Sequence, residues 1–122
     1  MKIGIIGDIH ANYPALKAVL EALEHQNVEK IYCSGDVVGY GPHPEKCINE
    51  LKERKIPTVA GNHDQYVANT EKKTGTFSHE STAESIEWTR QNLSSAAIEW
   101  LAALPLSLTD SDNGFQLVHL SH

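Results

Sequence analysis

The 122-residue sequence lacks several features that mark specialised classes of protein. It has only two cysteines, Cys33 and Cys47, and no Cys-x-x-Cys pair, which favours reduced thiols over a disulfide framework. No apolar run approaches the ~20 residues of a membrane-spanning helix, and no signal peptide precedes the first apolar stretch. We therefore expect a soluble, cytoplasmic protein that has no membrane partner.

Basic residues are also in the minority. The sequence contains 10 Lys and Arg residues against 16 Asp and Glu residues, which gives a formal net charge of -6. Because nucleic-acid surfaces depend on clustered Lys and Arg, no such surface is evident. There is no internal repeat and no low-complexity segment. The length fits one domain, residues 1–122, with room for a hydrophobic core.

The opening stretch carries the strongest pattern that is present. An apolar run from Ile3 to Ile6 leads through Gly7 to a carboxylate, Asp8, and an imidazole, His10. Such a run predicts a strand buried on both faces, as in parallel sheets, and α/β sheets bind ligands at their carboxyl edge. On an extended chain Asp8 and His10 point the same way, so together they predict part of a metal site. Taken alone, the pair also fits a strand end with a solvated Asp and His.

The same design recurs three times along the chain. A second apolar run ends just before Asp36, a third ends before Asn62 and His63, and a fourth ends at His119. Neighbouring parallel strands end at the same edge of a sheet, so we expect these side chains to meet Asp8 there.

The remaining pattern predicts helices between and after the strands. Asn12 is a favourable N-cap for a first helix, whose apolar positions recur at helical spacing, and Pro44 is placed to begin a second. A capping-box motif predicts a third helix over residues 81–93, and Ser94 is placed to cap a fourth.

The order of the elements predicts the fold class, which is α/β. A strand, a helix and a strand in succession imply parallel pairing, with helices flanking the sheet. The Asn113-Gly114 pair predicts a hairpin at the end of the chain. Residues 65–78 are polar, and we expect them to form a mobile loop over the site.

Four motifs in this order resemble the pattern of the calcineurin-like metallophosphoesterases. They are Asp-x-His, Gly-Asp, Gly-Asn-His and a later lone His. The segment GDVVGYGP, at residues 35–42, is similar to the small bacterial phosphodiesterase branch of that family. The resemblance implies a metallophosphoesterase-like fold and hydrolysis of a small phosphomonoester or phosphodiester by a water that two metal ions activate. The implied cofactors are two divalent ions, with Mn²⁺, Fe²⁺ and Zn²⁺ all suited to mixed nitrogen and oxygen ligands.

The resemblance also implies a metal-binding role for five residues. Asp36 would bridge the two ions, Asp8 and His10 would hold one of them, and Asn62 and His119 would hold the other. Each residue alone has a structural alternative. Asp36 is also a typical turn residue, Asn62 a typical helix cap, and His119 an ordinary strand-end histidine.

His63 is the catalytic residue that the resemblance implies, as the acid that protonates the leaving oxygen. In several branches of the family a further Asp after the Gly-Asp pair orients this histidine. Here Gly39 stands in that place, and Asp64 is the candidate for the orienting role. No substrate-binding residue is identified.

The likeness extends over the N-terminal half of the family pattern. Family members continue to a Gly-His-x-His motif, which gives each ion one more ligand, and to the second sheet of an αββα sandwich. Neither is found before the sequence closes at His122. One account is an enzyme whose further ligands come from water, from His122 or from a second chain. The other is a truncated or degenerate member without activity, which acts as a metal-binding or interaction module.

A missing second sheet has a consequence for assembly. Strands that are apolar on both faces would leave one face in water, and large exposed apolar patches mark interaction sites. We therefore expect a homo-oligomer that covers this face.

Overall fold

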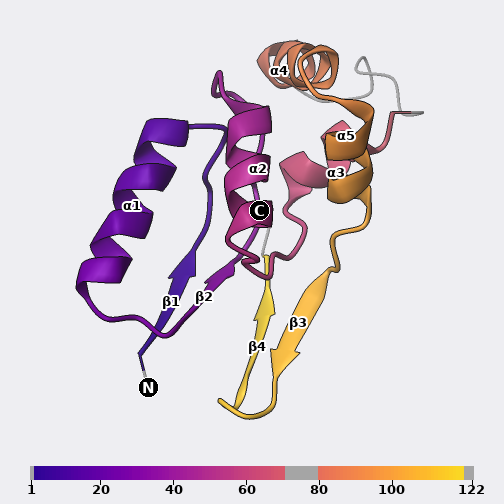
Figure 1. The fold of residues 1–122 in the computed structure, drawn as a ribbon. Helices are drawn as coiled ribbons and strands as arrows, with labels where there is room; N and C mark the ends of the chain where they lie inside the picture. The colour runs from indigo at the N-terminus through magenta and orange to yellow at the C-terminus, as the bar shows by residue number, and fades with distance from the viewer. Residues whose placement is uncertain (1, 71–79, 120–122) are drawn as a thin grey trace.

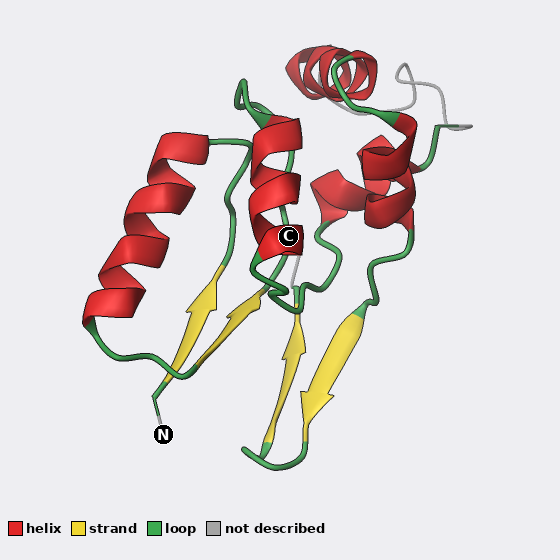
Figure 2. Cartoon of the chain, viewed as in Figure 1, coloured by secondary structure: helices red, strands yellow, loops and turns green. Residues whose placement is uncertain are grey.

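The computed structural model describes residues 2–70 and 80–119. The elements follow one another in an α/β order (Figures 1 and 2): β1 (Ile3–Ile6), α1 (Tyr13–His25), β2 (Lys30–Cys33), α2 (Pro44–Glu53), α3 (Asn62–Ala68), α4 (Glu80–Gln91), α5 (Ser95–Ala102), β3 (Ser107–Asp110) and β4 (Phe115–Val118).

The parallel pairing of the first two strands is confirmed. β1 pairs with β2 in a register that runs from Ile3 opposite Lys30 to Ile6 opposite Cys33. The third expected strand is reduced to one bridge, between Cys33 and Thr58, because the segment is short and Pro57 has no N–H to donate to a ladder. The Pro57 carbonyl still accepts from Cys33 N at 2.9 Å, so the segment runs alongside β2 as predicted.

One face of this sheet is covered by helices. Leu16 and Leu20 of α1 and Ile48 and Leu51 of α2 are buried in the main core, and Figure 1 shows the two helices standing side by side. The predicted N-caps of α1 and α5 are confirmed. Their side-chain oxygens, on Asn12 and Ser94, each accept a backbone N–H at 3.1 Å.

The other face is covered in part by the hairpin. β3 and β4 pair antiparallel, with Leu108 opposite Leu117, and these side chains join Tyr32 and Val59 of the parallel layer in a second core cluster. The Tyr32 hydroxyl donates to the Asp110 carboxylate across the two layers. This hydrogen bond, with those from Asn113, holds the pKa of Asp110 below its usual range. The hairpin therefore supplies a short second layer, within a fold of the predicted α/β class.

Three local expectations are wrong. β1 is not buried on both faces, because the hairpin does not extend over Ile5, which is 55% exposed. Residues 65–68 of the predicted loop belong to α3, while residues 71–78 of that loop lie outside the described residues. α4 begins at Glu80, so the motif at residues 81–84 lies inside the helix and does not cap it.

Both cysteines are free and buried, as expected for reduced thiols. Burial raises the pKa of each thiol, Cys33 and Cys47, to about 12, so neither is a thiolate at neutral pH. Among the described helices, none has the length and apolar character required to cross a bilayer.

Candidate metal centre

The loop after β1 lies against the loop after β2. Asp8 N donates to the Gly35 carbonyl at 3.0 Å, and His10 N donates to the Asp36 carbonyl at 2.9 Å. The expectation of an extended chain through Asp8 and His10 is wrong, since their φ angles are 51° and 46°, in the left-handed region. The two side chains approach each other because these backbone hydrogen bonds hold a coiled loop. Non-glycine residues in this region cost ~1–2 kcal/mol each, and such strain clusters at functional sites.

The loop after β1 and the loop after β2 bring three predicted ligands together. One ligand atom from each of Asp8, His10 and Asp36 lies within 4.8 Å of the other two. His10 Nε2 is 4.0 Å from Asp8 Oδ1 and 3.7 Å from Asp36 Oδ2. The Asp8 side chain is 71% exposed and that of Asp36 only 7%, so the cluster opens to solvent on the Asp8 side.

The other two predicted ligands meet the opposite side of Asp36. His119, which directly follows β4, places Nε2 3.4 Å from Asp36 Oδ2. Asn62, the first residue of α3, places one terminal atom of its amide 3.2 Å from both Asp36 oxygens and from His119 Nε2. All five predicted metal ligands therefore lie around one carboxylate, which comes from the loop after β2.

The hydrogen bonds of the two imidazoles determine which nitrogen faces the cluster. His119 Nδ1 lies 2.8 Å from the Ser34 carbonyl, and His10 Nδ1 lies 3.4 Å from the Val38 carbonyl. A carbonyl can only accept, so each Nδ1 carries a proton and a neutral ring turns its Nε2 lone pair towards Asp36. Backbone partners of this kind fix the tautomer of metal-binding histidines.

These donors fit divalent cations. Two atoms bound ~2.1 Å from one ion lie roughly 3.0–4.2 Å apart, and the separations around Asp36 Oδ2 are 3.2, 3.4 and 3.7 Å. The Asn62 amide either donates its N–H groups to Asp36 or turns its oxygen towards lone pairs. With the oxygen inward, every atom that faces the cluster is an acceptor, and only a cation between them makes that arrangement favourable.

Asp64 fixes the two loops that carry Asp36 and Asn62. Its Oδ2 accepts from Asp36 N at 2.8 Å and from Gly61 N at 2.9 Å. Its Oδ1 accepts from Val37 N at 2.9 Å and from Val38 N at 3.2 Å. Asp64 is fully buried, and burial raises the pKa of its carboxyl to about 6, against the effect of these hydrogen bonds. One ionised side chain therefore satisfies four backbone donors.

The close approach of these loops also requires glycine. A Cβ on Gly61 would lie 2.2 Å from Asp36 Oδ1, and one on Gly35 would lie 2.5 Å from Gly61 N. The Asp36 Oδ1 atom accepts from His63 N at 3.0 Å, which leaves Oδ2 to face the other ligands. The glycines of the Gly-Asp and Gly-Asn-His motifs thus allow Asp36 to reach the start of α3.

The His63 ring packs against other aromatic rings, and no carboxylate of the described residues accepts a hydrogen bond from its Nδ1. Its Nδ1 is buried and has no hydrogen-bond partner, so Asp64, which is engaged by the backbone, does not orient it through that atom. The ring lies 4.8 Å from that of Tyr40, 5.1 Å from that of His10 and 5.9 Å from that of Tyr66. Neither the four hydrogen bonds to Asp64 nor the contact of His63 with Tyr40 could be expected from the sequence motifs.

The groups around His63 act on its pKa in opposite directions. Burial lowers the pKa of its imidazole, and the Asp36 carboxylate acts in the opposite direction. The imidazoles of His10 and His119 lower it further, and Asp8 raises it. The balance favours the neutral ring relative to a histidine in water.

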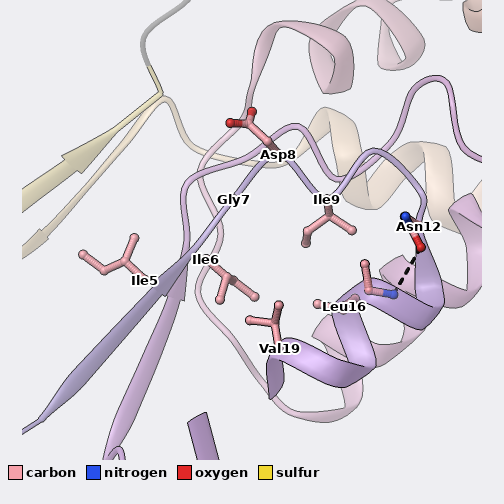
Figure 3. Close-up of a pocket in the computed structure, with 9 residues that line it drawn as sticks. Ile5, Ile6, Gly7, Asp8, Ile9, Asn12, Leu16 and Val19 are labelled. Carbon is pink, nitrogen blue, oxygen red and sulfur yellow. Dashed lines mark hydrogen bonds between the residues drawn. The ribbon is translucent and has the colours of Figure 1, made fainter. Parts of the chain in front are cut away.

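An apolar groove lies beside the cluster, between β1 and α1. Its volume is about 330 Å³, and Ile5, Ile9, Leu16 and Val19 are among the residues that line it. In Figure 3 these side chains gather between the strand and the helix, while the Asp8 carboxylate points away from them. The groove therefore adjoins the ligand cluster at Asp8, but the carboxylate of Asp8 does not point among its apolar side chains.

Replacing Asp64 tests the role of its carboxylate. An amide oxygen can accept from only one pair of N–H groups, so Asp64→Asn leaves buried donors unsatisfied at a cost of about 1–3 kcal/mol each. We expect the free energy of unfolding, measured with urea at pH 7.5, to fall by that amount or more. The exposed Asp112→Asn is the matched control, with a change within about 0.5 kcal/mol. Equal stability of the two variants would contradict the role given to Asp64.

Comparisons with known proteins identify a family and several relatives of this chain. The family model for calcineurin-like phosphoesterases matches residues 1–121. An uncharacterized protein of Methanocaldococcus jannaschii is 33% identical over 116 residues, which cover 95% of this chain and 47% of that protein. The symmetrical bis(5'-nucleosyl)-tetraphosphatase of Haemophilus ducreyi is 27% identical over 128 residues, which cover 94% of this chain and 43% of that protein.

A solved structure matches to a similar extent. A metallophosphoesterase from Sphaerobacter thermophilus aligns with a TM-score of 0.70 and 32% identity, over 90% of this chain and 44% of that one. The chain thus spans about half the length of the relatives it matches. The resemblance drawn from the motifs is confirmed, and the chain belongs to the calcineurin-like phosphoesterase family.

Proposed function

We propose that the chain hydrolyses a small phosphoester at the cluster around Asp36, with two divalent cations as cofactors. The observation that carries the proposal is that three chain segments place His10 Nε2, His119 Nε2 and one terminal atom of the Asn62 amide 3.2–3.7 Å from Asp36 Oδ2. In this proposal Asp8, His10 and Asp36 hold one cation, and Asp36, Asn62 and His119 hold the other. Mn²⁺, Fe²⁺ and Zn²⁺ all suit this ligand set.

The chemistry divides between the cations and the protein. Bound divalent cations supply the activation of a water nucleophile and neutralise charge on the phosphoryl oxygens. Asp36 holds them close together, and the exposed side of the cluster, at Asp8, admits the phosphoryl group. His63, which lies beside His10, donates a proton to the leaving oxygen.

The substrate class is a phosphomonoester or a small phosphodiester. The name of the Haemophilus ducreyi relative adds nucleoside polyphosphates to the substrates worth assaying. All of these present a phosphoryl group of the same chemistry to the cluster. The organic part of the substrate must therefore be recognised by other residues.

Loss of the central carboxylate should weaken metal binding. Asp36→Asn removes the charge that both cations share but keeps an oxygen for the hydrogen bond from His63 N. We expect the affinity for Mn²⁺, measured by isothermal titration calorimetry, to fall at least about tenfold. Asp112→Asn should bind as the wild type does. A variant Asp36→Asn with unchanged affinity would remove Asp36 from the metal site.

Replacing His63 separates proton donation from metal binding. His63→Ala should lower kcat for an alkyl phosphoester by ~10²–10⁴-fold, the usual contribution of general acid catalysis, while the Mn²⁺ content stays unchanged. With p-nitrophenyl esters the loss should shrink, since that leaving group scarcely needs a proton. The exposed His25→Ala is the control. An unchanged kcat on the alkyl ester would exclude His63 as the acid.

We also propose that the chain forms a homo-oligomer through the groove between β1 and α1. β1 pairs only with β2 among the described strands, and an unpaired strand edge can bind another strand. Ile5 and Val19 beside this edge are 55% and 44% exposed. His122, which could supply a ligand to a second chain, lies outside the described residues.

A charge in the groove should dissociate the oligomer. We expect light scattering at low micromolar concentration to show a dimer or larger species for the wild type and a monomer for Val19→Glu. Trp88→Glu, at a position that is 43% exposed on α4, is the matched control and should stay associated. A monomeric wild type that unfolds cooperatively would contradict the proposal.

A further inference from the structure

Tyr40 is a large aromatic residue on the surface at the edge of the metal centre. Tyr40 belongs to neither of the two core clusters, and the residue is 59% exposed. Its ring lies 4.8 Å from the His63 ring and 5.5 Å from the His10 ring, tilted by 57° and 59°. The ring therefore contacts the imidazoles of the site, although the residue as a whole stays largely exposed.

The backbone presents this ring in a fixed and strained position. Tyr40 has a φ of 68°, which a bulky residue rarely adopts. Tyr40 N donates to Ser85 Oγ of α4 at 2.7 Å, and its hydroxyl lies 3.5 Å from Thr82 Oγ1 of the same helix. On the other side Gly41 N donates to the His10 carbonyl at 3.0 Å. The loop is thus tied both to α4 and to the strand end that carries a proposed ligand.

Packing in the core does not account for this arrangement. A left-handed tyrosine is unfavourable, and a ring left in water gains little from burial. Gly39, the preceding residue, has a φ of 102°, and a Cβ there would lie 2.7 Å from His63 Nδ1. Two successive left-handed residues therefore accompany a Tyr40 ring that lies against the His63 and His10 rings, while the backbone passes close beside His63.

We propose that Tyr40 is a stacking platform for the aromatic base of a nucleotide whose phosphate binds at the Asp36 cluster. The inference rests on the proposed function and adds to it the recognition of the organic part of the substrate. A flat, solvent-facing ring next to the two imidazoles suits a base joined to its phosphate by one ribose. Stacking on an aromatic side chain accepts any base, because every base has a π-face.

Equilibrium binding with three matched ligands tests the platform. In the presence of Mn²⁺, calorimetry compares inorganic phosphate with the phosphonate analogues of ribose 5-phosphate and adenosine 5'-monophosphate, which differ by the sugar and then by the base. A methylene group replaces the ester oxygen in both analogues, so the protein cannot hydrolyse them. We expect the wild type to bind the adenosine analogue ~5- to 150-fold more tightly than the ribose analogue, the range for one stacked base. Tyr40→Ala should remove this advantage and leave the affinity for phosphate unchanged.

Two further variants separate stacking from support of the loop. Tyr40→Phe keeps the ring and should keep the preference for the base. Tyr40→Asn loses the ring but tolerates a left-handed backbone, so it should behave as Tyr40→Ala does even if alanine disturbs the loop. Weaker binding of all three ligands by both ring-less variants would overturn the platform, because the ring would then serve the phosphate site itself.

Different results would overturn the stacking platform and the proposed phosphoesterase function. Equal affinity of the wild type for the adenosine analogue and for the ribose analogue would overturn the platform and leave the metal centre standing. If inorganic phosphate and both analogues fail to bind in the presence of Mn²⁺, the proposed function is overturned and the platform with it.

Discussion

The four hydrogen bonds to the buried Asp64 carboxylate are the constraint on which the site depends. They join the loop after β2 to the start of α3, because Asp64 accepts from Asp36, Val37, Val38 and Gly61 at once. Ionising a buried carboxyl group is costly, and burial indeed raises its pKa to about 6. Four backbone donors, which would otherwise be buried without partners, offset that cost. The result is a rigid base from which Asp36 and Asn62 project.

The rigid base around Asp64 also affects the electrostatics of the site, because it fixes the orientation of the Asp36 carboxylate. Asp36 uses Oδ1 to accept from the N-terminus of α3 and leaves Oδ2 facing His10, His119 and Asn62. Backbone carbonyls hold the proton of each imidazole on Nδ1 and so keep the Nε2 lone pairs inward. The protein therefore concentrates acceptors at one point and places its own donors behind them. Such an arrangement is unfavourable alone and favourable around a cation.

Part of this structure could be predicted from the sequence because the signals are local. Asn12 and Ser94 are caps whose hydrogen bonds involve only the next turn of helix, and Asn113-Gly114 specifies its own turn. The strand-end positions of Asp8, Asp36 and His119 follow from apolar runs followed by polar residues, and the structure brings these residues together. Their roles as ligands stay a proposal.

The features that could not be predicted depend on contacts between distant segments. The bonds to Asp64 connect residues 26–28 positions apart in the sequence, and only its place at the third position of α3 gives a local signal. The left-handed backbone at Asp8 and His10 follows from hydrogen bonds to the loop after β2, which strand periodicity does not reveal. The exposure of Ile5 depends on how far the hairpin extends, which an apolar run cannot show.

The most direct measurement is a Mn²⁺ titration followed by NMR of the histidine side chains. Without metal, we expect the neutral forms of the His10 and His119 rings to carry their proton on Nδ1. Substoichiometric Mn²⁺ should then broaden the signals of these two rings first, and leave the exposed His25 sharp. If His25 broadens as readily as His10 and His119, or if neither of these two responds, the cluster around Asp36 is not a metal centre.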